Sequence, residues 1–594
     1  MKKLSDYVFD FVAAQGVKHV FLLPGGGAMH LVDSLGRSGK LSYVCNLHEQ
    51  ACAIAADAYS QYTNNLGVAL VTTGPGGTNT ITGVTASWLD SIPVLFISGQ
   101  VKRADMAGKR KVRQMGFQEI DIVSLVRPIT KYAVTVTEPE DIRYHLEKAL
   151  HLARSGRPGP AWIDIPLDVQ AAMVHEKMLR SFRPPPKDSH SNINKAVAAL
   201  VQMLNQSKRP VILAGNGVRL SGAEKKFRSL ITALKVPVLT TWKAIDFLPD
   251  RHPLYVGRPG AVGQRGANFA QQNADLILII GARLDLGQTA YNHANFARGA
   301  KKIMVDADPH EIRKMGMKID LPVACDALEF IVEMLKRKYN VKDNGRAEWL
   351  KRCKNWQKKY PVVLDEYREQ KRFVNDYVLI DVLSDEMGPD DLLVPGSSGA
   401  CSERAMQAFR VKEGLRVFNS QGLGSMGFGI PMAIGGCIAS GGKQTICIEG
   451  DGGFIMNIQE LEVVRRLDLP IKFFVLNNQG YVSIQATQKN YFGGNFVAST
   501  KGSGLSLPDY KKVARSFGIP SCRLKDHKDM RRKIRDILDM DGPVVCEVMV
   551  SPDQMTAPRV SSRQQEDGSM VSMPMEDLWP FLDREEFNDN MVIC

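Results

Sequence analysis

Two neighbouring stretches in the last third of the chain decide the fold class. Residues 450–457 read Gly-Asp-Gly-Gly-Phe-Ile-Met-Asn, and residues 471–480 read Ile-Lys-Phe-Phe-Val-Leu-Asn-Asn-Gln-Gly. Short apolar runs at 445–449 and 472–476 are typical of buried strands. Apolar residues at helical spacing lie between the runs, namely Ile458, Leu461, Val464 and Leu467. The pattern predicts a strand–helix–strand unit whose two strands are parallel.

Asp451 and Asn478 would then project from the same edge of a sheet, because parallel strands end at one edge. Oxygen ligands of this kind suit Mg²⁺, which completes its coordination with water and phosphate. The neighbouring glycines let backbone N–H groups approach a phosphate at a helix start. For Gly-Asp-Gly alone, a tight turn with Asp as helix N-cap explains the residues equally well. The paired asparagines favour a metal–diphosphate site.

The composition is that of an ordinary globular protein. The chain has 594 residues, of which 44% are hydrophobic and 23% charged, and its length predicts three or four domains. No apolar run reaches the roughly 18 residues of a membrane span, and the first residues do not resemble a signal peptide, so we expect a cytoplasmic protein. The ten cysteines are scattered without a Cys-x-x-Cys pair, which favours reduced, buried thiols.

The formal net charge of +13 does not by itself indicate a nucleic-acid partner. Much of it lies in residues 336–372, where basic residues alternate with acids and aromatics. A solvated helical face is the simpler explanation of that stretch, and an RNA-binding arm is the alternative. We expect neither a nucleic-acid nor a membrane partner.

Strand-like and helical segments alternate along the whole chain, which predicts an α/β fold of three doubly wound, largely parallel-sheet domains. Proline-rich residues 183–188 mark one boundary. We predict a first domain at 1–170, a central domain at 190–340, a charged helical linker at 341–369 and a third domain at 370–550. Residues 551–594 are predicted to form a C-terminal tail or lid with little regular structure.

Glu49 follows a predicted strand and precedes a predicted helix. Alone it is explained by the helix dipole, which favours acids at helix starts. A second glycine loop, Gly-Pro-Gly-Gly-Thr-Asn at 74–79, and the polar cluster Phe117-Gln118-Glu119 change this interpretation.

Together these motifs resemble those of the thiamine diphosphate (ThDP) enzymes, and most closely the acetolactate synthase large-subunit family. The resemblance covers about residues 1–550 in the same domain order. Further stretches carry it: Pro-Gly-Gly at 24–26, His-Glu-Gln at 48–50, Leu-Asp-Ser-Ile-Pro-Val at 89–94, Gly-Phe-Gln-Glu-Ile-Asp at 116–121, Ser-Gly-Arg-Pro-Gly-Pro at 155–160 and Gly-Leu-Gly-Ser-Met-Gly-Phe-Gly at 422–429.

The resemblance implies a role for each matching residue. Glu49 would bond the pyrimidine ring of ThDP and shuttle the proton that activates the thiazolium carbon. Asp451, Asn478 and the Gly480 carbonyl would hold Mg²⁺ on the diphosphate. Phe117 and Gln118 would act with Glu49 and favour pyruvate as donor. The other implied ThDP contacts are Pro24, Gly25, Pro75, Asn79, Gly399, Gly424, Met426, Gly450, Gly452 and Gly453. For Met426, core packing is the alternative.

The central domain resembles the flavin-binding type of the family. The matching residues are Arg157, Gly215, Gly260, Gly281, Arg283, Asp306 and Asp308. Many relatives keep this domain without a flavin, so an empty domain is the alternative to FAD. The two acids follow a predicted strand end, where a ribose or adenine could be held.

Two departures from the family pattern concern the acceptor. Gly287 stands where relatives have an arginine that grips the carboxylate of a second keto acid, and Thr487 stands where they have a tryptophan. Loss of a charge clamp and a bulky wall should weaken selection for a small keto acid. The C-terminal residues 556–563 resemble members of a flavin-containing side branch that adds a two-carbon unit to a keto-deoxysugar nucleotide. Arg559 and Arg563 could then meet an acceptor's phosphates, or be ordinary surface charges.

The sequence therefore predicts a carboligase that decarboxylates pyruvate and transfers the two-carbon unit to a carbonyl acceptor, with a nucleotide-linked keto sugar as candidate. An acetolactate synthase that uses a second 2-keto acid is the near alternative. More distant alternatives are a 2-keto acid oxidase with a redox-active flavin, and a nucleic-acid-binding or purely regulatory protein built on a catalytically dead enzyme fold. The family's sites form between subunits, so we expect a homodimer or homotetramer.

Overall fold

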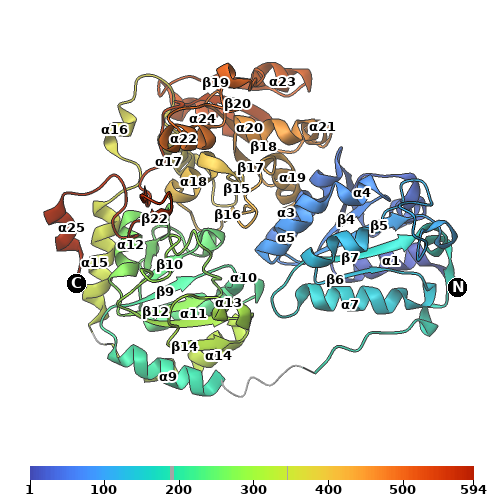
Figure 1. Ribbon diagram of the computed structural model, residues 1–594, viewed down its shortest axis with the longest axis horizontal. Coiled ribbons are helices and arrows are strands. Elements are labelled where there is room, and N and C mark those ends of the chain that lie inside the picture. The colour runs from blue at the N-terminus through green and yellow to red at the C-terminus, as the bar shows by residue number, and fades with distance from the viewer. Residues whose placement is uncertain (187–192, 344, 594) are drawn as a thin grey trace.

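Three six-stranded sheets organise the molecule, one in each domain (Figure 1). The computed structural model describes residues 1–186, 193–343 and 345–593. Every neighbouring pair of strands in the three sheets is parallel. The predicted α/β fold class is therefore confirmed.

The first and third sheets have the same topology. Numbered along each domain, the strand order of both is 2-1-3-4-6-5. The first sheet contains, in spatial order, β3 (Ser42–Cys45), β2 (His19–Leu22), β4 (Gly67–Val71), β5 (Val94–Gln100), β7 (Ala161–Pro166) and β6 (Tyr132–Thr135). The third contains β16 (Arg416–Val417), β15 (Leu392–Val394), β17 (Thr445–Gly450), β18 (Ile471–Asn477), β20 (Val544–Met549) and β19 (Ser521–Leu524).

The middle sheet has the order 3-2-1-4-5-6, which is that of dinucleotide-binding folds. Its strands are β11 (Tyr255–Gly257), β10 (Val238–Thr240), β9 (Pro210–Ala214), β12 (Leu276–Ile280), β13 (Lys301–Asp306) and β14 (Leu321–Ala324). The order reverses between β9 and β12, and ligands of such sheets bind beyond the carboxyl ends of the strands at that point.

Helices cover both faces of each sheet. In the first domain one face is covered by α1 (Leu4–Ala14), α2 (Met29–Arg37) and α7 (Ile142–Arg154), and the other by α3 (Glu49–Thr63), α5 (Ile81–Asp90) and α6 (Ile122–Val126). The third domain has α17 (Asp376–Glu386), α18 (Gly399–Ala408) and α24 (Met530–Leu538) on one face, and α19 (Gly429–Ala439), α21 (Leu461–Arg466) and α23 (Tyr510–Ser516) on the other. The middle domain has α9 (Ile193–Gln206), α11 (Glu224–Leu234) and α14 (Ala327–Lys336) opposite α12 (Arg265–Gln272) and α15 (Arg346–Lys359).

Helices α3 and α19 pack together and join the first and third domains into one apolar core (Figure 1). The approach is so close that a Cβ on Gly435 of α19 would lie 2.2 Å from the carbonyl oxygen of Ala55 in α3. Only glycine fits there, because real Cβ atoms do not approach other atoms so closely. The two domains are thereby fixed relative to each other.

The predicted strand–helix–strand unit is present, since β17 and β18 pair in parallel. Its connection is not one helix. It consists of α20 (Asp451–Phe454), a 3₁₀ segment (Ile455–Glu460) and α21. The break lies at Asn457, whose φ is −134° and whose side-chain amide donates to Gln50 Oε1 and the Gly427 carbonyl. These long-range hydrogen bonds are not visible in the helical spacing of the sequence.

The charged linker and the tail have more tertiary structure than the sequence indicates. Helix α15 buries Trp349, Cys353 and Trp356 against the middle domain, so it is not simply a solvated face. The tail contains a hairpin of β21 (Ser562–Gln564) and β22 (Met570–Ser572) and ends in α25 (Arg584–Asn590). Trp356 Nε1 donates to Asn590 Oδ1 at 2.6 Å, which ties the tail to the middle domain.

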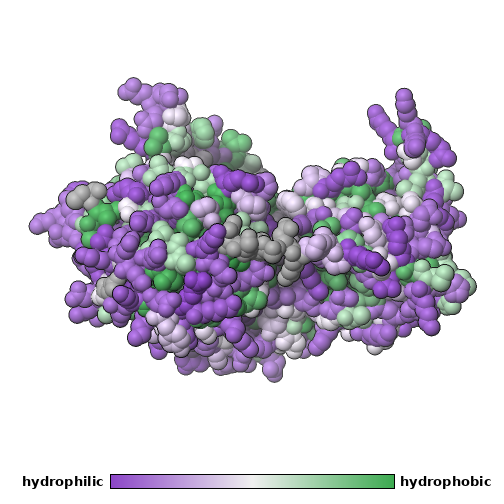
Figure 2. Space-filling model, turned by 90° about the horizontal axis from the view of Figure 1, so that it is seen from below, coloured by the Kyte–Doolittle hydropathy of each residue, from purple (hydrophilic) through white to green (hydrophobic). Residues whose placement is uncertain are grey.

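The surface is largely hydrophilic on the face shown in Figure 2. Among the described residues, no helix is both long and apolar enough to cross a membrane. The nine cysteines in the described ranges are free thiols, seven of them buried, and Cys594 lies outside those ranges.

Candidate active site

Asp451 stands at the carboxyl end of β17, where it begins α20. Its Oδ1 accepts the Gly452 N–H at 2.7 Å, and its Oδ2 accepts the N–H groups of Asn478 at 3.1 Å and Gly480 at 3.3 Å. The Tyr510 hydroxyl donates to the Asp451 carbonyl at 2.7 Å. Burial raises the pKa of this carboxyl to about 6. The carboxylate is thus held toward the end of β18.

The side chain of Asn478 is the unpaired member of this group. Its Oδ1 is buried and accepts no hydrogen bond. Other buried amide oxygens of the described residues also lack a donor, for example Asn46 Oδ1, but Asn478 Oδ1 lies at the strand end where the Asp451 carboxylate could share a cation with it. In the described part of the chain no three His, Cys, Asp or Glu side chains gather as a metal site. One carboxylate, one amide oxygen and a backbone carbonyl nevertheless fit Mg²⁺, which takes its remaining ligands from water and phosphate.

The loop beside Asp451 is lined by glycine because neighbouring side chains approach it closely. A Cβ on Gly452 would lie 2.2 Å from the Tyr481 ring and 3.0 Å from Met426 Cε, and one on Gly453 would lie 2.4 Å from the Glu449 carboxylate. Met426 therefore touches the loop that carries Asp451. Of the other predicted contacts in this domain, Gly450 precedes α20, Gly399 begins α18 after β15, and Gly424 lies in the loop before α19.

Glu49 begins α3 at the carboxyl edge of the first sheet, and only 7% of it is exposed. Its Oε2 accepts a hydrogen bond of 3.0 Å from Asn79 Nδ2. Asn79 follows the short helix α4 (Pro75–Thr78). Pro24 and Gly25 follow β2 at the same edge, and a Cβ on Gly25 would lie 2.5 Å from Thr72. The predicted residues of this domain are therefore gathered at one sheet edge.

Gln118 lies against this edge, whereas Phe117 points away from the protein. The backbone of Gln118 has φ +64°, and its carbonyl oxygen would be 2.3 Å from a Cβ on Gly74. Phe117 is 86% exposed. Within a single chain Phe117 thus lines no closed pocket.

The two sheet edges meet through residues next to the predicted site. Gln50 accepts from Asn457 Nδ2 at 3.0 Å, and Glu460 accepts from the Leu47 N–H at 2.9 Å. Among residues 1–186, 193–343 and 345–593, Glu49 hydrogen-bonds only within the first domain, and no hydrogen bond joins it to Asp451 or Asn478. One chain therefore presents the two halves of the predicted site without joining them directly.

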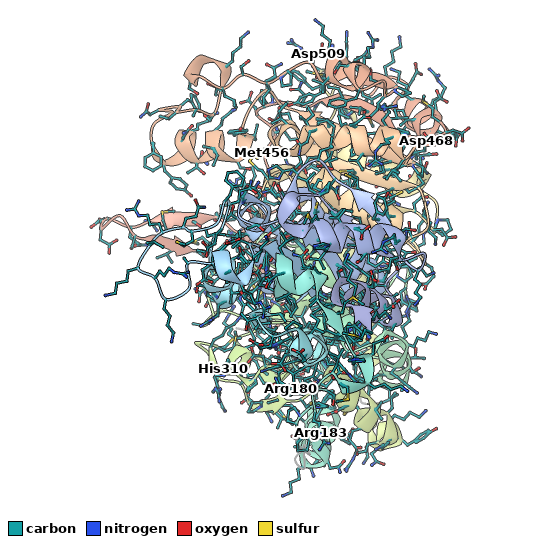
Figure 3. All side chains as sticks on the ribbon, turned by 90° about the vertical axis from the view of Figure 1, so that its right-hand side faces the viewer. Arg180, Arg183, His310, Met456, Asp468 and Asp509 are labelled. Carbon is teal, nitrogen blue, oxygen red and sulfur yellow. The ribbon has the colours of Figure 1, made fainter. Side chains whose placement is uncertain are left out.

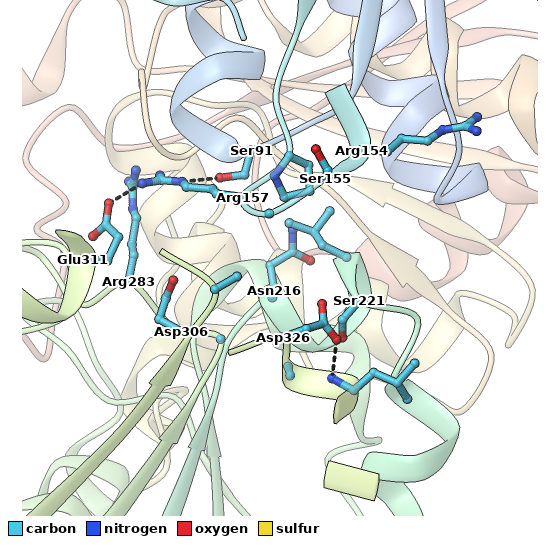
Figure 4. Close-up of a pocket in the computed structure, with 18 of the residues that line it drawn as sticks. Ser91, Arg154, Ser155, Arg157, Asn216, Ser221, Arg283, Asp306, Glu311 and Asp326 are labelled. Carbon is cyan, nitrogen blue, oxygen red and sulfur yellow. Dashed lines mark hydrogen bonds and ion pairs between the residues drawn. The ribbon is translucent and has the colours of Figure 1, made fainter. Parts of the chain in front are cut away.

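A cavity of about 1420 Å³ lies beyond the carboxyl ends of the middle sheet, between the middle and first domains (Figure 4). Arg157 reaches into it from the first domain. Its guanidinium donates to Ser91 Oγ at 2.8 Å and pairs with Glu311. Asp306, at the end of β13, also lines the cavity, and burial raises its pKa to about 6.

Four of the seven predicted flavin contacts line this cavity, namely Arg157, Gly281, Arg283 and Asp306. Gly215, Gly260 and Asp308 lie outside its lining. Gly215 allows the loops after β9 and β12 to approach closely, since a Cβ on this residue would lie 2.3 Å from the Gly281 carbonyl oxygen. Asp308 caps α13 (Pro309–Arg313) by accepting from the His310 N–H. The cavity lies where sheets of this strand order bind dinucleotides, and its volume is large enough for such a ligand.

Lys243 lines the cavity and joins all three domains, and no motif in the sequence indicates this role. Its amine donates to Gln61 Oε1 at 2.9 Å, to Asp90 Oδ2 at 3.2 Å and to the Asn419 carbonyl at 2.6 Å. Asp90 also accepts the N–H groups of Gln421 and Gly422, at the start of the loop that carries Met426. The cavity wall and the cofactor loop therefore share one polar cluster.

Glu449 is a second residue that sequence reasoning missed. It is fully buried before Gly450, with its oxygens accepting the N–H groups of Gly429 at 2.9 Å and Gly450 at 3.2 Å. Burial without a nearby cation raises its pKa to about 7. The acid at the end of the apolar run Thr-Ile-Cys-Ile-Glu could have indicated a buried carboxyl group.

Positions 287 and 487, which are predicted to contact the acceptor, hold Gly and Thr. Thr487 lies on helix α22 (Val482–Tyr491), none of whose residues is buried. Its hydroxyl donates to the Ser483 carbonyl of the same helix at 3.1 Å. Next to Gly287, Leu286 is 53% exposed. Arg559 lies in the tail, where its backbone pairs with Trp579, and Arg563 lies on β21.

Comparison with known proteins accounts for all three domains. Models of thiamine pyrophosphate enzymes match residues 2–125 as the N-terminal TPP binding domain, 197–334 as the central domain and 397–548 as the C-terminal TPP binding domain. The chain belongs to the thiamine pyrophosphate enzyme family.

Within this family it is similar to acetolactate synthase large subunits. It is 32% identical over 571 residues to that of Cyanidium caldarium, covering 93% of this chain and 94% of the relative. It is 30% identical over 562 residues to the large subunit of acetolactate synthase isozyme 1 of Escherichia coli, covering 94% and 95%. A probable acetolactate synthase large subunit of Methanocaldococcus jannaschii is 32% identical over 566 residues, with 93% and 92% covered. The protein is an acetolactate synthase-like, ThDP-dependent carboligase.

Proposed function

We propose that this enzyme requires Mg²⁺, decarboxylates pyruvate and transfers the two-carbon unit to the carbonyl of a nucleotide-linked keto-deoxysugar. The buried, unpaired Asn478 Oδ1 beside the Asp451 carboxylate is the observation that carries the cofactor part of the proposal. An Mg²⁺ ion there would satisfy it and bind the diphosphate.

The residues of the chain would act as follows. ThDP supplies an acidic carbon and an electron sink that permit loss of carbon dioxide from a 2-keto acid. Glu49 would hold and move the proton at a ring nitrogen of the pyrimidine, with Asn79 orienting its carboxylate. Asp451, Asn478 and the Gly480 carbonyl would hold the metal, and Met426 would support the cofactor from the loop before α19, where its side chain lies beside Gly452. Phe117 and Gln118 would contact the donor.

The acceptor part rests on the small side chains at 287 and 487. Without an arginine at 287, a second keto acid would lack its carboxylate partner, and without a tryptophan at 487 the site would admit a larger carbonyl compound. The similarity to acetolactate synthases favours the alternative, in which a second 2-keto acid is the acceptor.

We also propose that the central cavity binds FAD. Its place at the reversal of strand order and its predicted contacts Arg157, Gly281, Arg283 and Asp306 support this. Gly215, Gly260 and Asp308 would shape the surrounding loops. A purified protein that carries stoichiometric FAD with a flavin absorption spectrum is the expected result.

The active form is proposed to be a homodimer or a homotetramer built from it. Large apolar side chains are exposed on segments that carry predicted site residues, namely Leu47, Phe117, Met456 and Ile484, and on the loop after α22, namely Phe492 and Val497. Met456 stands at the boundary of the first and third domains (Figure 3). Exposed apolar residues in such number favour a covering partner. A second copy would also bring its Glu49 close to Asp451 and Asn478 of the first copy.

Incubation with pyruvate, ThDP and Mg²⁺ against a panel of acceptors, followed by mass spectrometry, tests the proposal. Product that carries a two-carbon branch on a nucleotide-linked keto sugar is expected. Rapid acetolactate formation from pyruvate alone would instead support the acetolactate synthase alternative.

A further inference from the structure

We propose that a cationic loop of the first domain, residues 107–116, binds the diphosphate group of the acceptor. The inference rests on the proposed function, because it assigns a binding site to the charged part of a nucleotide-linked acceptor. None of the predicted ThDP, Mg²⁺ or FAD contacts lies in this loop.

The cationic loop carries four exposed basic side chains and no acid: Lys109, Arg110, Lys111 and Arg113. None of the four forms an ion pair with any residue in the described ranges. Arg110 donates only to the Met106 carbonyl, at 2.7 Å. The nearby Arg103 is different, since its guanidinium pairs with Asp168 at 2.7 Å. In Figure 3 a light-blue loop of the first domain projects at the left with long side chains that end in nitrogen.

A buried carboxylate fixes both ends of the cationic loop. Glu119, 9% exposed, accepts the Ala107 N–H with one oxygen. Its other oxygen accepts the N–H groups of Met115 at 2.8 Å and Gly116 at 3.2 Å. Four like charges are thereby confined to a short closed loop without a counterion inside the chain. Their mutual repulsion would be relieved by a bound anion.

The base of the cationic loop stands at the predicted catalytic edge. Gln118 follows Gly116 by two residues and rests on Gly74, next to the helix that presents Asn79 to Glu49. Since an extended chain spans at most about 3.6 Å per residue, the backbone of Arg113 lies within roughly 18 Å of Gln118. An acceptor could keep its anionic part on the loop while its carbonyl lies at the catalytic edge.

The charge pattern fits a diphosphate better than a carboxylate. A second keto acid carries one negative charge, whereas a diphosphate carries two or more on several oxygens that Arg and Lys can share. A nucleic acid is disfavoured, because the cations lie on one short loop and not along a stripe or groove. The remaining candidate occupant is an acidic surface of a second copy, which the experiment distinguishes.

The test is calorimetric binding of uridine diphosphate to the full-length holoenzyme loaded with ThDP, Mg²⁺ and FAD, so that the cofactor sites are filled. The variant Lys109→Gln/Lys111→Gln/Arg113→Gln should raise the Kd about tenfold or more. A control variant with the same charge change, Lys225→Gln/Lys226→Gln/Lys358→Gln, lies on exposed positions of the middle domain and should change the Kd less than about twofold. The charge-conserving Lys109→Arg/Lys111→Arg variant should keep the affinity.

Equal affinity of the wild type and the loop variant would overturn the inference. So would a loop variant that shifts the oligomeric state in sedimentation experiments, since the loop would then contact a second copy. Transfer from pyruvate to acetaldehyde, an acceptor without phosphate, tests the proposed function separately. A wild type that binds uridine diphosphate through the loop but releases no carbon dioxide from pyruvate would contradict the proposed function and leave the binding site standing.

Discussion

At the scale of single residues, the two asparagines after β18 have different environments. Asn477 is fully paired, since its Nδ2 donates to Glu547 at 2.7 Å and its Oδ1 accepts from the Gln479 N–H. Asn478 Oδ1 has no partner. The neighbours therefore form a matched pair of a structural amide and a candidate metal ligand.

We predict opposite phenotypes for the two alanine variants. Asn478→Ala should weaken Mg²⁺ binding in the presence of ThDP by about tenfold or more, because a ligand is lost, and should change the stability of the cofactor-free protein by less than about 0.5 kcal/mol. Asn477→Ala should lower that stability by about 1–2 kcal/mol and affect Mg²⁺ less. Metal titration and urea unfolding measure both, and the reverse pattern would remove Asn478 from the metal site.

A second residue-scale prediction concerns pH. Asp164 is fully buried, accepts from Ser98, Gln100 and Thr135, and has its pKa raised to about 7 by burial. Because the folded pKa lies above the unfolded value, its stabilising contribution is complete below about pH 4 and is lost as the pH rises through about 7.

The free energy of unfolding of Asp164→Asn should therefore rise relative to that of the wild type as the pH rises, by roughly 4 kcal/mol between about pH 4 and 8. Asp168→Asn is the control of opposite sign. The Arg103 pair lowers the pKa of Asp168, so its contribution is lost as the pH falls. Urea unfolding at both ends of the range measures the difference, and a pH-independent difference for Asp164→Asn would contradict the assignment.

At the scale of elements, the α3–α19 contact carries the junction of the first and third domains. Gly435→Ala should destabilise the protein by about 1–3 kcal/mol, because the new methyl group would meet the Ala55 carbonyl. Gly36 in α2 is the control, since nothing lies within 4 Å of its Cβ position. Gly36→Ala should be neutral or stabilising by up to about 1 kcal/mol. Equal thermal shifts of the two variants would show that the helix contact is looser than described.

Lys243 links the cavity wall to the cofactor loop at the same scale. Lys243→Met would leave Asp90 without its cation in a site where that carboxylate is 4% exposed, and should cost about 3 kcal/mol. We expect a raised KM for ThDP, because Asp90 also holds Gln421 and Gly422. Lys225→Met, on the exposed side of α11, is the control. An unchanged KM for ThDP would separate the polar cluster from the cofactor loop.

Elements that local sequence patterns specify were predicted well. Strand β17 extends the predicted run at 445–449 by one residue, and β18 extends the predicted run at 472–476 by one residue at each end. Features that depend on distant partners were not. The break at Asn457 needs Gln50, and the burial of α15 needs α12 and the tail.

At the scale of the whole molecule, one chain holds the Glu49 half and the Asp451 half of the predicted site at two sheet edges that share only neighbouring contacts. The positions of Asp451 and Asn478 at strand ends predicted that part of the site from local patterns, because parallel strands end at one edge of a sheet. The role of Glu49 came from the resemblance to the family and not from its position alone. Neither kind of reasoning indicates how these two groups of residues meet, since that depends on packing between domains and, in our proposal, on a second copy.

Assembly should therefore accompany activity. Light scattering should give a dimer or tetramer of the 65.7 kDa chain. Phe492→Asp and Val497→Asp, placed on exposed apolar positions, should favour the monomer and reduce turnover together. Full activity in a demonstrated monomer would contradict a site shared between copies.

The central claim is that Glu49 serves ThDP-dependent decarboxylation of pyruvate. The release of labelled carbon dioxide from pyruvate labelled at carbon 1 tests it most directly. The wild-type enzyme and Glu49→Gln are compared, each saturated with ThDP and Mg²⁺, with cofactor binding measured in parallel. Glu49→Gln should bind ThDP but release carbon dioxide at least about 100-fold more slowly, because the proton-transfer group is lost. Equal release by the two proteins, or no release by the wild type, would contradict the account.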